Sequence, residues 1–536
     1  MTENVGTARK NPNAGRSFSH MSIQSATVEP HAPIPETGST VRKARAGMAL
    51  SIATFVMAAA SGLQAILYLG RFGTNARTDG FFVAFAVYTT FGVFSQTLRV
   101  TCVPLLVEPK ARLSVREFAA ALGLLAVPVL LATGLLASPV SHLLAPGLGT
   151  AARSVTATAL PILGAAMTLQ LWAAGGATVL AVRDRFAPVA TAYIAGAVAG
   201  LAVFVGAMGR AGVQTLGWSM LAMAVVTCAT MLAGVAGSGG LGQTRRSLRP
   251  KALARATGLL LGGTPVYLAF NMLFVITLAF ASKGATGDST VLSYAYLFAS
   301  YLVAGTGTAL GMSRIPEMTR RARFKGCALV EETVPQGFGY AMLLVAPAIA
   351  GLITAAPLIH VLVPTSLTSA GVHTLRTFTA LLAPWAVVAL LANFLIPALL
   401  ASGRSRLLNQ LALPVVAIHL AATAIGSALF GVSGAVGAIT VAPACLAVIL
   451  LVSGAGRRRY APVANRLTRQ TVAFVGLAAA AFGVAWALSA PVSSAGAAAA
   501  LAAALGGAAY MIGLRVVARR ELDVLLGALA ARRGPS

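Results

Sequence analysis

The residue whose type and position are most informative is Asp79, which stands at the start of an apolar segment, directly before the pair Phe81-Phe82. A charge at the mouth of a membrane helix is costly unless it faces an internal cavity or a partner. One interpretation is that Asp79 faces a cavity and pairs at the outer mouth with Arg71 or Arg77, both within eight residues of it. The other interpretation is that Asp79 caps its own helix. The residues alone leave both open.

A second candidate is Arg99, which lies inside the apolar segment that Asp79 begins. An arginine there either extends its charge to the inner lipid headgroups or faces a cavity, where its planar guanidinium recognises a diphosphate. Three amides, Gln64, Gln96 and Asn271, also lie within apolar segments, where interhelical hydrogen bonding is the usual role. The candidate cavity or gate residues are Asp79, Arg71, Arg77, Gln64, Gln96, Arg99 and Asn271.

Motifs for enzymatic chemistry are absent from the sequence. It contains no Walker A motif, no dinucleotide-binding fingerprint and no zinc-ligand spacing. The four cysteines are scattered and form no metal set or disulfide framework. We therefore expect no enzymatic activity, no cofactor and no metal site. Any transport must be driven by an ion gradient, the membrane potential or the gradient of the substrate itself.

The composition indicates a membrane protein. The chain of 536 residues is 57% hydrophobic and only 10% charged, whereas a soluble domain carries about 25% charged residues. Such a chain cannot cover itself with a polar surface. A net charge of +27 would suggest nucleic acid as the partner of a soluble protein. In a membrane protein the same charge has another explanation, so we expect no nucleic-acid partner.

Fourteen segments are long and apolar enough to span a membrane, which takes about 20 residues. They are roughly 47–69, 80–106, 117–140, 157–181, 187–208, 214–236, 257–282, 290–312, 334–356, 376–401, 408–430, 432–454, 470–490 and 494–516. The predicted fold class is an all-α polytopic membrane protein with about 14 transmembrane helices, in two six-helix lobes plus two C-terminal helices.

The distribution of basic residues predicts the orientation of these spans. With the N-terminus inside, 33 of the 40 Lys and Arg residues fall on the inner side, six fall on the outer side, and Arg99 lies within a span. The positive-inside rule expects this imbalance. We therefore predict a multi-pass protein of a bacterial-type plasma (inner) membrane with both termini cytoplasmic. Anionic inner-leaflet lipids would be partners of the basic inner surface.

Two basic turns, 181–186 and 401–407, suggest an internal repeat, because each follows a long helix rich in Ala and Leu. Chance similarity of two basic inner turns is the alternative. Transporters commonly bind their substrates between such repeats. The predicted organisation is a disordered basic cytoplasmic tail (1–45), an N-terminal six-helix lobe (46–236), a cytoplasmic linker (237–256), a C-terminal six-helix lobe (257–454), two additional transmembrane helices (455–516) and a cytoplasmic tail (517–536).

Several motifs occur in an order and spacing that resemble one known family. They are TDGFFVAF at 78–85, FSQ at 94–96, LSYAY at 292–296, IPEMT at 315–319 and LLASG at 399–403. Together they resemble the MviN/MurJ-type lipid II flippases, members of the multidrug/oligosaccharidyl-lipid/polysaccharide exporter superfamily. The resemblance covers nearly the whole helical region.

This resemblance implies fourteen helices, transport by alternating access, and a role in peptidoglycan biosynthesis, cell-wall biogenesis and cell shape. It also implies that the carboxylate at Asp79 matters for transport. The sequence departs from the family at other positions: Gln64 and Ala58 stand where the family has cavity-facing arginines, and Leu297 and Ser300 replace an Arg and a Glu. The sequence thus keeps Asp79 and loses most of the cationic cavity.

Three functions remain open at this point. The first is a flippase of an isoprenoid-lipid-linked cell-envelope precursor, lipid II-like or another lipid-linked saccharide, with cell-envelope synthesis proteins as further partners. The second is an exporter of a small amphiphilic or cationic molecule. The third is a non-transporting membrane scaffold related to the flippases. A cationic cavity would favour the first, an apolar cavity the second, and a filled interior the third.

Overall fold

The computed structural model describes residues 60–107, 114–183, 185–239, 250–262, 264–304, 328–362, 369–456 and 459–519, with the isolated residues 53, 56, 57 and 306. The chain divides into two compact units, 1–45 and 46–536, and all described residues belong to the second. The predicted tail at 1–45 and most of that at 517–536 therefore lie outside the described residues. Every regular element within the described ranges is helical. The prediction of an all-α polytopic membrane protein is confirmed.

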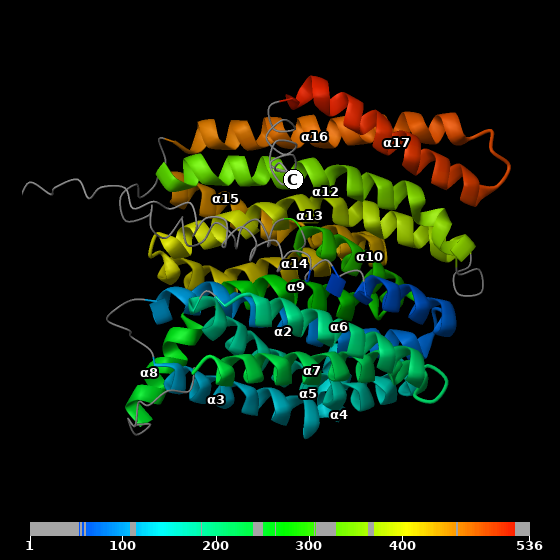
Figure 1. Ribbon diagram of the computed structural model, residues 1–536. Coiled ribbons are helices and arrows are strands. Elements are labelled where there is room, and N and C mark those ends of the chain that lie inside the picture. The colour runs from blue at the N-terminus through cyan, green and yellow to red at the C-terminus, as the bar shows by residue number, and fades with distance from the viewer. Residues whose placement is uncertain are drawn as a thin grey trace, which may run out of the picture. The chain divides into compact units, whose positions relative to one another are not determined.

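The first half of this unit forms a group of adjacent helices, drawn in the lower part of Figure 1. It contains a helix at 60–72, α2 (Ala76–Val107), α3 (Val115–Gly134), α4 (Ala137–Leu144), α5 (Thr150–Val182), α6 (Ala187–Ala207), the short η1 (Gly212–Gln214) and α7 (Thr215–Gly237). Local sequence determines several of the ends. Ser114 and Glu117, for example, form a capping box that starts α3.

The second half contributes the remaining helices, most of them in the upper part of Figure 1. They are α8 (Pro250–Leu261), α9 (Pro265–Ala281), α10 (Asp288–Val303), α12 (Ala328–Leu362), α13 (Ser369–Ala401), α14 (Ser405–Ala438), α15 (Val441–Ala455), α16 (Tyr460–Ser489) and α17 (Ala495–Val517). The last two pack against each other and against α12.

Each of the fourteen predicted spans overlaps a helix. Among the described residues, nine helices are long and apolar enough to cross a membrane, or ten if the bent pair of α8 and α9 forms one span. The predicted span 257–282 is this pair, bent by 57°, because Pro265 starts a new helix. The predicted boundary near residue 431 is a break inside α14, at Gly431 with a φ of 62°. For the whole chain, fourteen spans stays a prediction.

The same packing pattern occurs in both halves. In the first, α5 packs against α2, α3 and α7, and in the second, α13 packs against α10, α12 and α15. Arg183, after α5, donates to the carbonyl oxygen of Ser238 at the end of α7. Arg404, after α13, donates to that of Ser453 near the end of α15. The two basic turns thus bind helix C-termini in equivalent ways. We call helix 60–72 with α2–α7 the N-terminal lobe, and α9–α15 the C-terminal lobe.

Candidate functional site

The residues before Asp79 fix how α2 begins. Gly73, with a φ of 64°, follows helix 60–72. The side-chain oxygen of Asn75 accepts hydrogen bonds from the backbone N–H groups of Arg77 at 2.9 Å and Thr78 at 3.2 Å. Asn75 is therefore the N-cap of α2. Asp79 does not cap its own helix, and its carboxylate is available to another element.

Glycine at position 80 lets this start of α2 lie directly against α5. A Cβ at Gly80 would lie 2.1 Å from the carbonyl oxygen of Ala152, so no side chain fits there. The hydroxyl of Thr156 donates to the carbonyl oxygen of Gly80 at 2.7 Å. The start of α2 is thus held rigidly within the N-terminal lobe.

The carboxylate of Asp79 bonds to the C-terminal lobe. Its Oδ2 accepts from the backbone N–H of Gly287 at 2.7 Å. Its Oδ1 accepts from the backbone N–H of Thr290 at 2.8 Å and from the Thr290 hydroxyl at 2.7 Å. Asp79 is 1% exposed. These three hydrogen bonds therefore replace the water that a carboxylate otherwise needs.

The partners of Asp79 form the first turn of α10. Gly287, with a φ of 100°, is the N-cap residue of α10, and no side chain of its own segment caps the helix. A helix start leaves backbone N–H groups without intrahelical acceptors and carries a partial positive charge. Asp79 supplies both the acceptor and the negative charge. Helix α2 of one lobe thus caps α10 of the other; we call this the Asp79–α10 contact.

Two threonines extend the Asp79–α10 contact. The hydroxyl oxygens of Thr78 and Thr290 lie 3.2 Å apart. An ideal Cβ at Gly287 would lie 3.2 Å from the Cβ of Thr74, so the turn between helix 60–72 and α2 touches the N-cap of α10. The two lobes therefore meet closely along this edge.

A second meeting point of the lobes is the loop between α4 and α5. A Cβ at Gly147 would lie 2.4 Å from the carbonyl oxygen of Ser282, directly after α9. Only a glycine fits between two backbones at this spacing. Arg153 holds the loop in place, because its guanidinium donates to the carbonyl oxygens of Ala145 and Pro146 at 3.3 Å and 3.0 Å. In the predicted orientation, both meeting points would lie on the outer side of the membrane.

The predicted ion pair of Asp79 with Arg71 or Arg77 is wrong. Both arginines are exposed whereas Asp79 is buried, and neither pairs with it within the part of the chain that the structure describes. Arg77 lies two positions from Asp79 on the same helix, which places the side chains on different faces. Backbone N–H groups satisfy the carboxylate without the cost of burying a guanidinium.

The lobes also contact each other further along α10, beyond the Asp79–α10 contact. The hydroxyl of Tyr294 on α10 donates to the carbonyl oxygen of Ala65 at 3.0 Å. The rings of Phe82 and Tyr294 lie with their centroids 5.1 Å apart. Tyr294 is six positions beyond Asp288, a rise of about 9 Å along a helix. The contact between the lobes thus continues along α10 from the Asp79–α10 contact toward the middle of the helix.

The predicted amides behave differently from one another. Gln64 is 2% exposed, and its side-chain oxygen has no hydrogen-bond partner among the described residues. The side chain of Asn271 donates to the carbonyl oxygen of Tyr267 within its own helix, at 2.8 Å. The backbone carbonyl of Asn271 accepts from the hydroxyl of Thr90 on α2 at 3.4 Å. At Asn271 the backbone, and not the predicted side chain, joins two helices.

The other two predicted residues are described only in part. The backbones of Gln96 and Arg99 belong to α2, but their side chains lie outside the described residues. Their roles stay predictions. Within the described ranges, no group of His, Cys, Asp and Glu side chains is placed to hold a metal ion.

Sequence reasoning missed the partners of Asp79. The run Gly287-Asp288-Ser289-Thr290 has the composition of a helix start, and that signal was available. Nothing local links it to a carboxylate 208 residues earlier. Gly147 carried no signal either, since glycine is common throughout this chain.

Comparisons with known proteins support the fold. No protein-family model and no curated protein matches this sequence. Among solved structures, the inward closed conformation of the lipid II flippase MurJ matches with a TM-score of 0.68 at 13% identity, over 88% of this chain and 98% of that chain. The eukaryotic MATE transporter AtDTX14 matches with a TM-score of 0.59 at 16% identity, over 81% and 99% of the two chains.

A third match shows that the fold serves more than one function. It is a transporter of the MOP superfamily from Pyrococcus furiosus, in which a reverse polarity of the binding pocket suggests a different function. Its TM-score is 0.57 at 14% identity, over 79% of this chain and 96% of that chain. These similarities confirm the fold that the resemblance to the flippases implies. They leave the substrate to be argued from the residues.

Proposed function

We propose that this protein is a membrane transporter that flips an isoprenoid-lipid-linked cell-envelope precursor across a bacterial plasma membrane by alternating access. The observation that carries the proposal is the Asp79–α10 contact. Its donors and its acceptor lie on different lobes. Any opening between the lobes on the outer side must break it. Cell-envelope synthesis proteins are the partners that such a substrate implies.

The energetics of this contact suit a reversible gate. A hydrogen bond to a charged group contributes about 1.5–3 kcal/mol, net of the hydrogen bonds to water that it replaces. When the lobes separate, water solvates both the carboxylate and the first turn of α10. The contact therefore favours the closed state by a finite amount, which a substrate can shift if it binds the open state more tightly. A permanent apolar interface would not have this property.

A second candidate function is export of a small amphiphilic or cationic molecule. The observation that favours it concerns charge: away from the span ends, Arg99 is the only Lys or Arg within the fourteen predicted spans. A diphosphate in a low-dielectric cavity needs paired positive charge, which this chain supplies sparsely. Neither candidate function assigns a catalytic step to the chain.

A flipping assay decides between these functions. The full chain is reconstituted in proteoliposomes and given lipid II, other lipid-linked saccharides and, separately, a fluorescent cationic amphiphile. We expect a lipid-linked saccharide to be flipped. Movement of the cationic amphiphile alone would support the second candidate. Absence of any transport, from protein that is correctly folded, would overturn the proposal and favour the scaffold.

A disulfide across the contact tests alternating access itself. In a background without the four native cysteines, Thr78→Cys is combined with Thr290→Cys, whose native hydroxyls lie 3.2 Å apart. Oxidation should stop transport, and reduction should restore it. The control pair, Gly200→Cys with Met223→Cys, joins α6 to α7 within one lobe, where the ideal Cβ of Gly200 lies 3.1 Å from that of Met223. Oxidation of that pair should leave transport intact.

A further inference from the structure

Helix α8 differs from its neighbours in direction. In Figure 1 the long helices run roughly parallel, whereas α8 runs steeply across their left-hand ends. It is bent by 57° from α9 and packs against α3. The charge asymmetry assigns this end of the lobes to the inner side. We infer that α8, which crosses the ends of the long helices and has one polar face, lies along the membrane surface.

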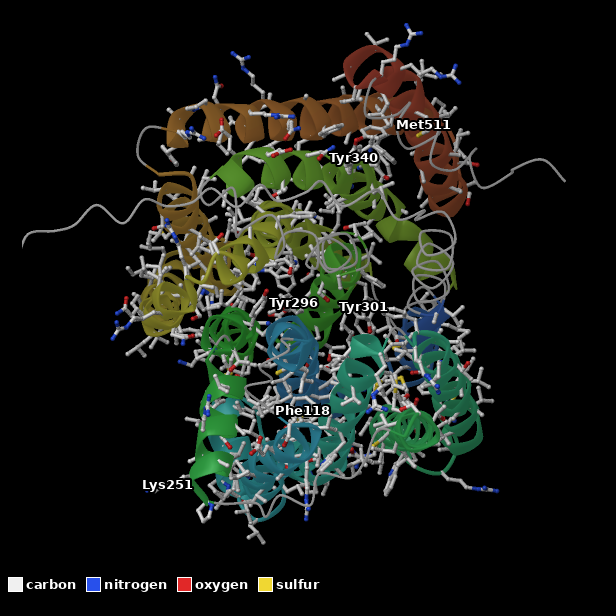
Figure 2. All side chains as sticks on the ribbon, turned by 60° about the vertical axis from the view of Figure 1, so that its left-hand side comes forward. Phe118, Lys251, Tyr296, Tyr301, Tyr340 and Met511 are labelled. Carbon is white, nitrogen blue, oxygen red and sulfur yellow. The ribbon has the colours of Figure 1, made fainter. Side chains whose placement is uncertain are left out.

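The two faces of α8 differ in character. Ala256 and Leu260 are buried, Leu253 is half-buried, and all three pack in one cluster with Phe118 of α3. Their spacing of three and four residues forms one helical face. In Figure 2, Phe118 lies among the helices of the N-terminal lobe, and Lys251 lies at the outlying end of α8. The face that carries Lys251 is therefore free of α3.

Two cations lie on this free face, and a third lies on the neighbouring helix. Lys251 and Arg255 are exposed, four positions apart, with the small residues Ala254 and Gly258 beside them. A Cβ at Gly258 would meet no atom within 4 Å, so a bulky group has room there. Arg116, in the first turn of the neighbouring α3, is exposed as well.

These cations have no acidic partner in the described part of the chain. Lys251, Arg255 and Arg116 form no ion pair there, and the sequence contains no Asp or Glu between Asp184 and Asp288. The acidic residue on the nearest turn of α3, Glu117, is used in the capping box. Exposed Leu261, at the other end of α8, adds an apolar group to the same helix. Unpaired cations next to apolar side chains match a lipid surface.

We propose that Lys251, Arg255 and Arg116 form a binding surface for the headgroups of anionic phospholipids in the inner leaflet. The negative surface potential of that leaflet attracts each nearby cation, strengthening binding about fivefold per charge. The apolar face of α8 holds the helix on α3, so the cations stay at headgroup depth. This surface fixes the cytoplasmic end of the link between the lobes. The inference does not depend on transport or on the identity of the substrate.

Local lipid quenching tests the proposal. In the background without native cysteines, Ala254→Cys is labelled with a fluorophore, and the full chain is reconstituted in phosphatidylcholine vesicles. Spin-labelled phosphatidylglycerol or spin-labelled phosphatidylcholine is then added at equal mole fractions. We expect stronger quenching by phosphatidylglycerol, weakening at high salt because salt screens exposed charges. Lys251→Gln with Arg255→Gln should reduce the preference about fivefold per charge removed.

Two control variants separate a local site from overall charge. Arg210→Gln with Lys283→Gln removes the same charge from exposed residues at the opposite end and should leave the preference unchanged. Lys251→Arg with Arg255→Lys keeps the charge and should keep the preference. Equal quenching by both lipids in the parent chain would overturn the proposal. So would absence of quenching by either lipid, which would place α8 against water or a protein partner.

Discussion

Asp79 joins two lobes because a single carboxylate has two oxygens with room for several donors. Each oxygen accepts from the start of α10, and no water reaches the residue at 1% exposure. An uncharged side chain of the same shape would accept only some of these hydrogen bonds. The first prediction follows from that difference.

Replacing Asp79 with Asn should weaken the Asp79–α10 contact while keeping the fold. The amide oxygen still accepts from Thr290, but the amide nitrogen then faces the N–H of Gly287, donor against donor. We expect an impermeant thiol reagent to label Ser289→Cys faster in the Asp79→Asn chain, with near-normal expression and reduced transport. Asp79→Ala should also lower the free energy of unfolding, by about 2–4 kcal/mol, since it leaves buried N–H groups unpaired.

The same experiment identifies a purely structural Asp79. Unchanged labelling and full transport in Asp79→Asn, with loss of stability alone in Asp79→Ala, would reduce the residue to a helix cap. Ser289→Cys is a suitable reporter because Ser289 is 1% exposed, so the closed structure protects it. Cysteine also differs from serine by a single atom, so the substitution should disturb the packing little.

The sequence draws attention to Asp79 but does not indicate its partners. A charge beside Phe81 and Phe82 in an apolar segment is unusual enough to be recognised from residue types. Its donors are backbone N–H groups of Gly287 and Thr290, and every residue but proline has such a group. The sequence favours Arg71 and Arg77 as partners because their charge is visible in it. The backbone N–H groups at the start of a distant helix carry no such signal in the sequence.

At the scale of an element, the loop between α4 and α5 offers a second prediction. Gly147→Ala places a methyl group 2.4 Å from the carbonyl oxygen of Ser282, so the two backbones must separate. We expect faster labelling of Ser289→Cys, although Asp79 is intact. Gly149→Ala, two residues away, is the matched control, because a Cβ there meets nothing within 4 Å. Equal labelling in both variants would show that this loop plays no part in closure.

The positions of the helices along the chain can be predicted from the sequence, but the direction of α8 relative to the other helices cannot. Apolar length places every predicted span on a helix, since a spanning segment must satisfy its own backbone. The same criterion merged the apolar C-terminal end of α8 with α9, because only residues 262–264 lie between the two helices. The steep course of α8 depends on its packing against α3, which lies more than 100 residues earlier. A hydropathy profile does not contain that contact.

At the scale of the whole molecule, the N-terminal tail should be dispensable for insertion. The composition of residues 1–45 lacks the apolar content of a core. We expect a chain that lacks residues 1–38 to reach the membrane at the parent level, measured by membrane fractionation. This deletion spares Arg42, Lys43 and Arg45, which help to orient the first span. Loss of membrane-inserted protein would contradict the prediction.

The orientation of the molecule determines which side the Asp79–α10 contact closes, so it is the last prediction. With 33 basic residues on one side against six on the other, we expect both termini in the cytoplasm. In intact cells, an impermeant thiol reagent should then miss Arg245→Cys and Arg457→Cys until the membrane is permeabilised. It should label Lys283→Cys, which is exposed next to the Gly147 contact, without permeabilisation. The reverse pattern would move the Asp79–α10 contact to the cytoplasmic side. The same contact would then close an inner gate, and α8 would face the outer leaflet, where the headgroups that we assign to it are scarce.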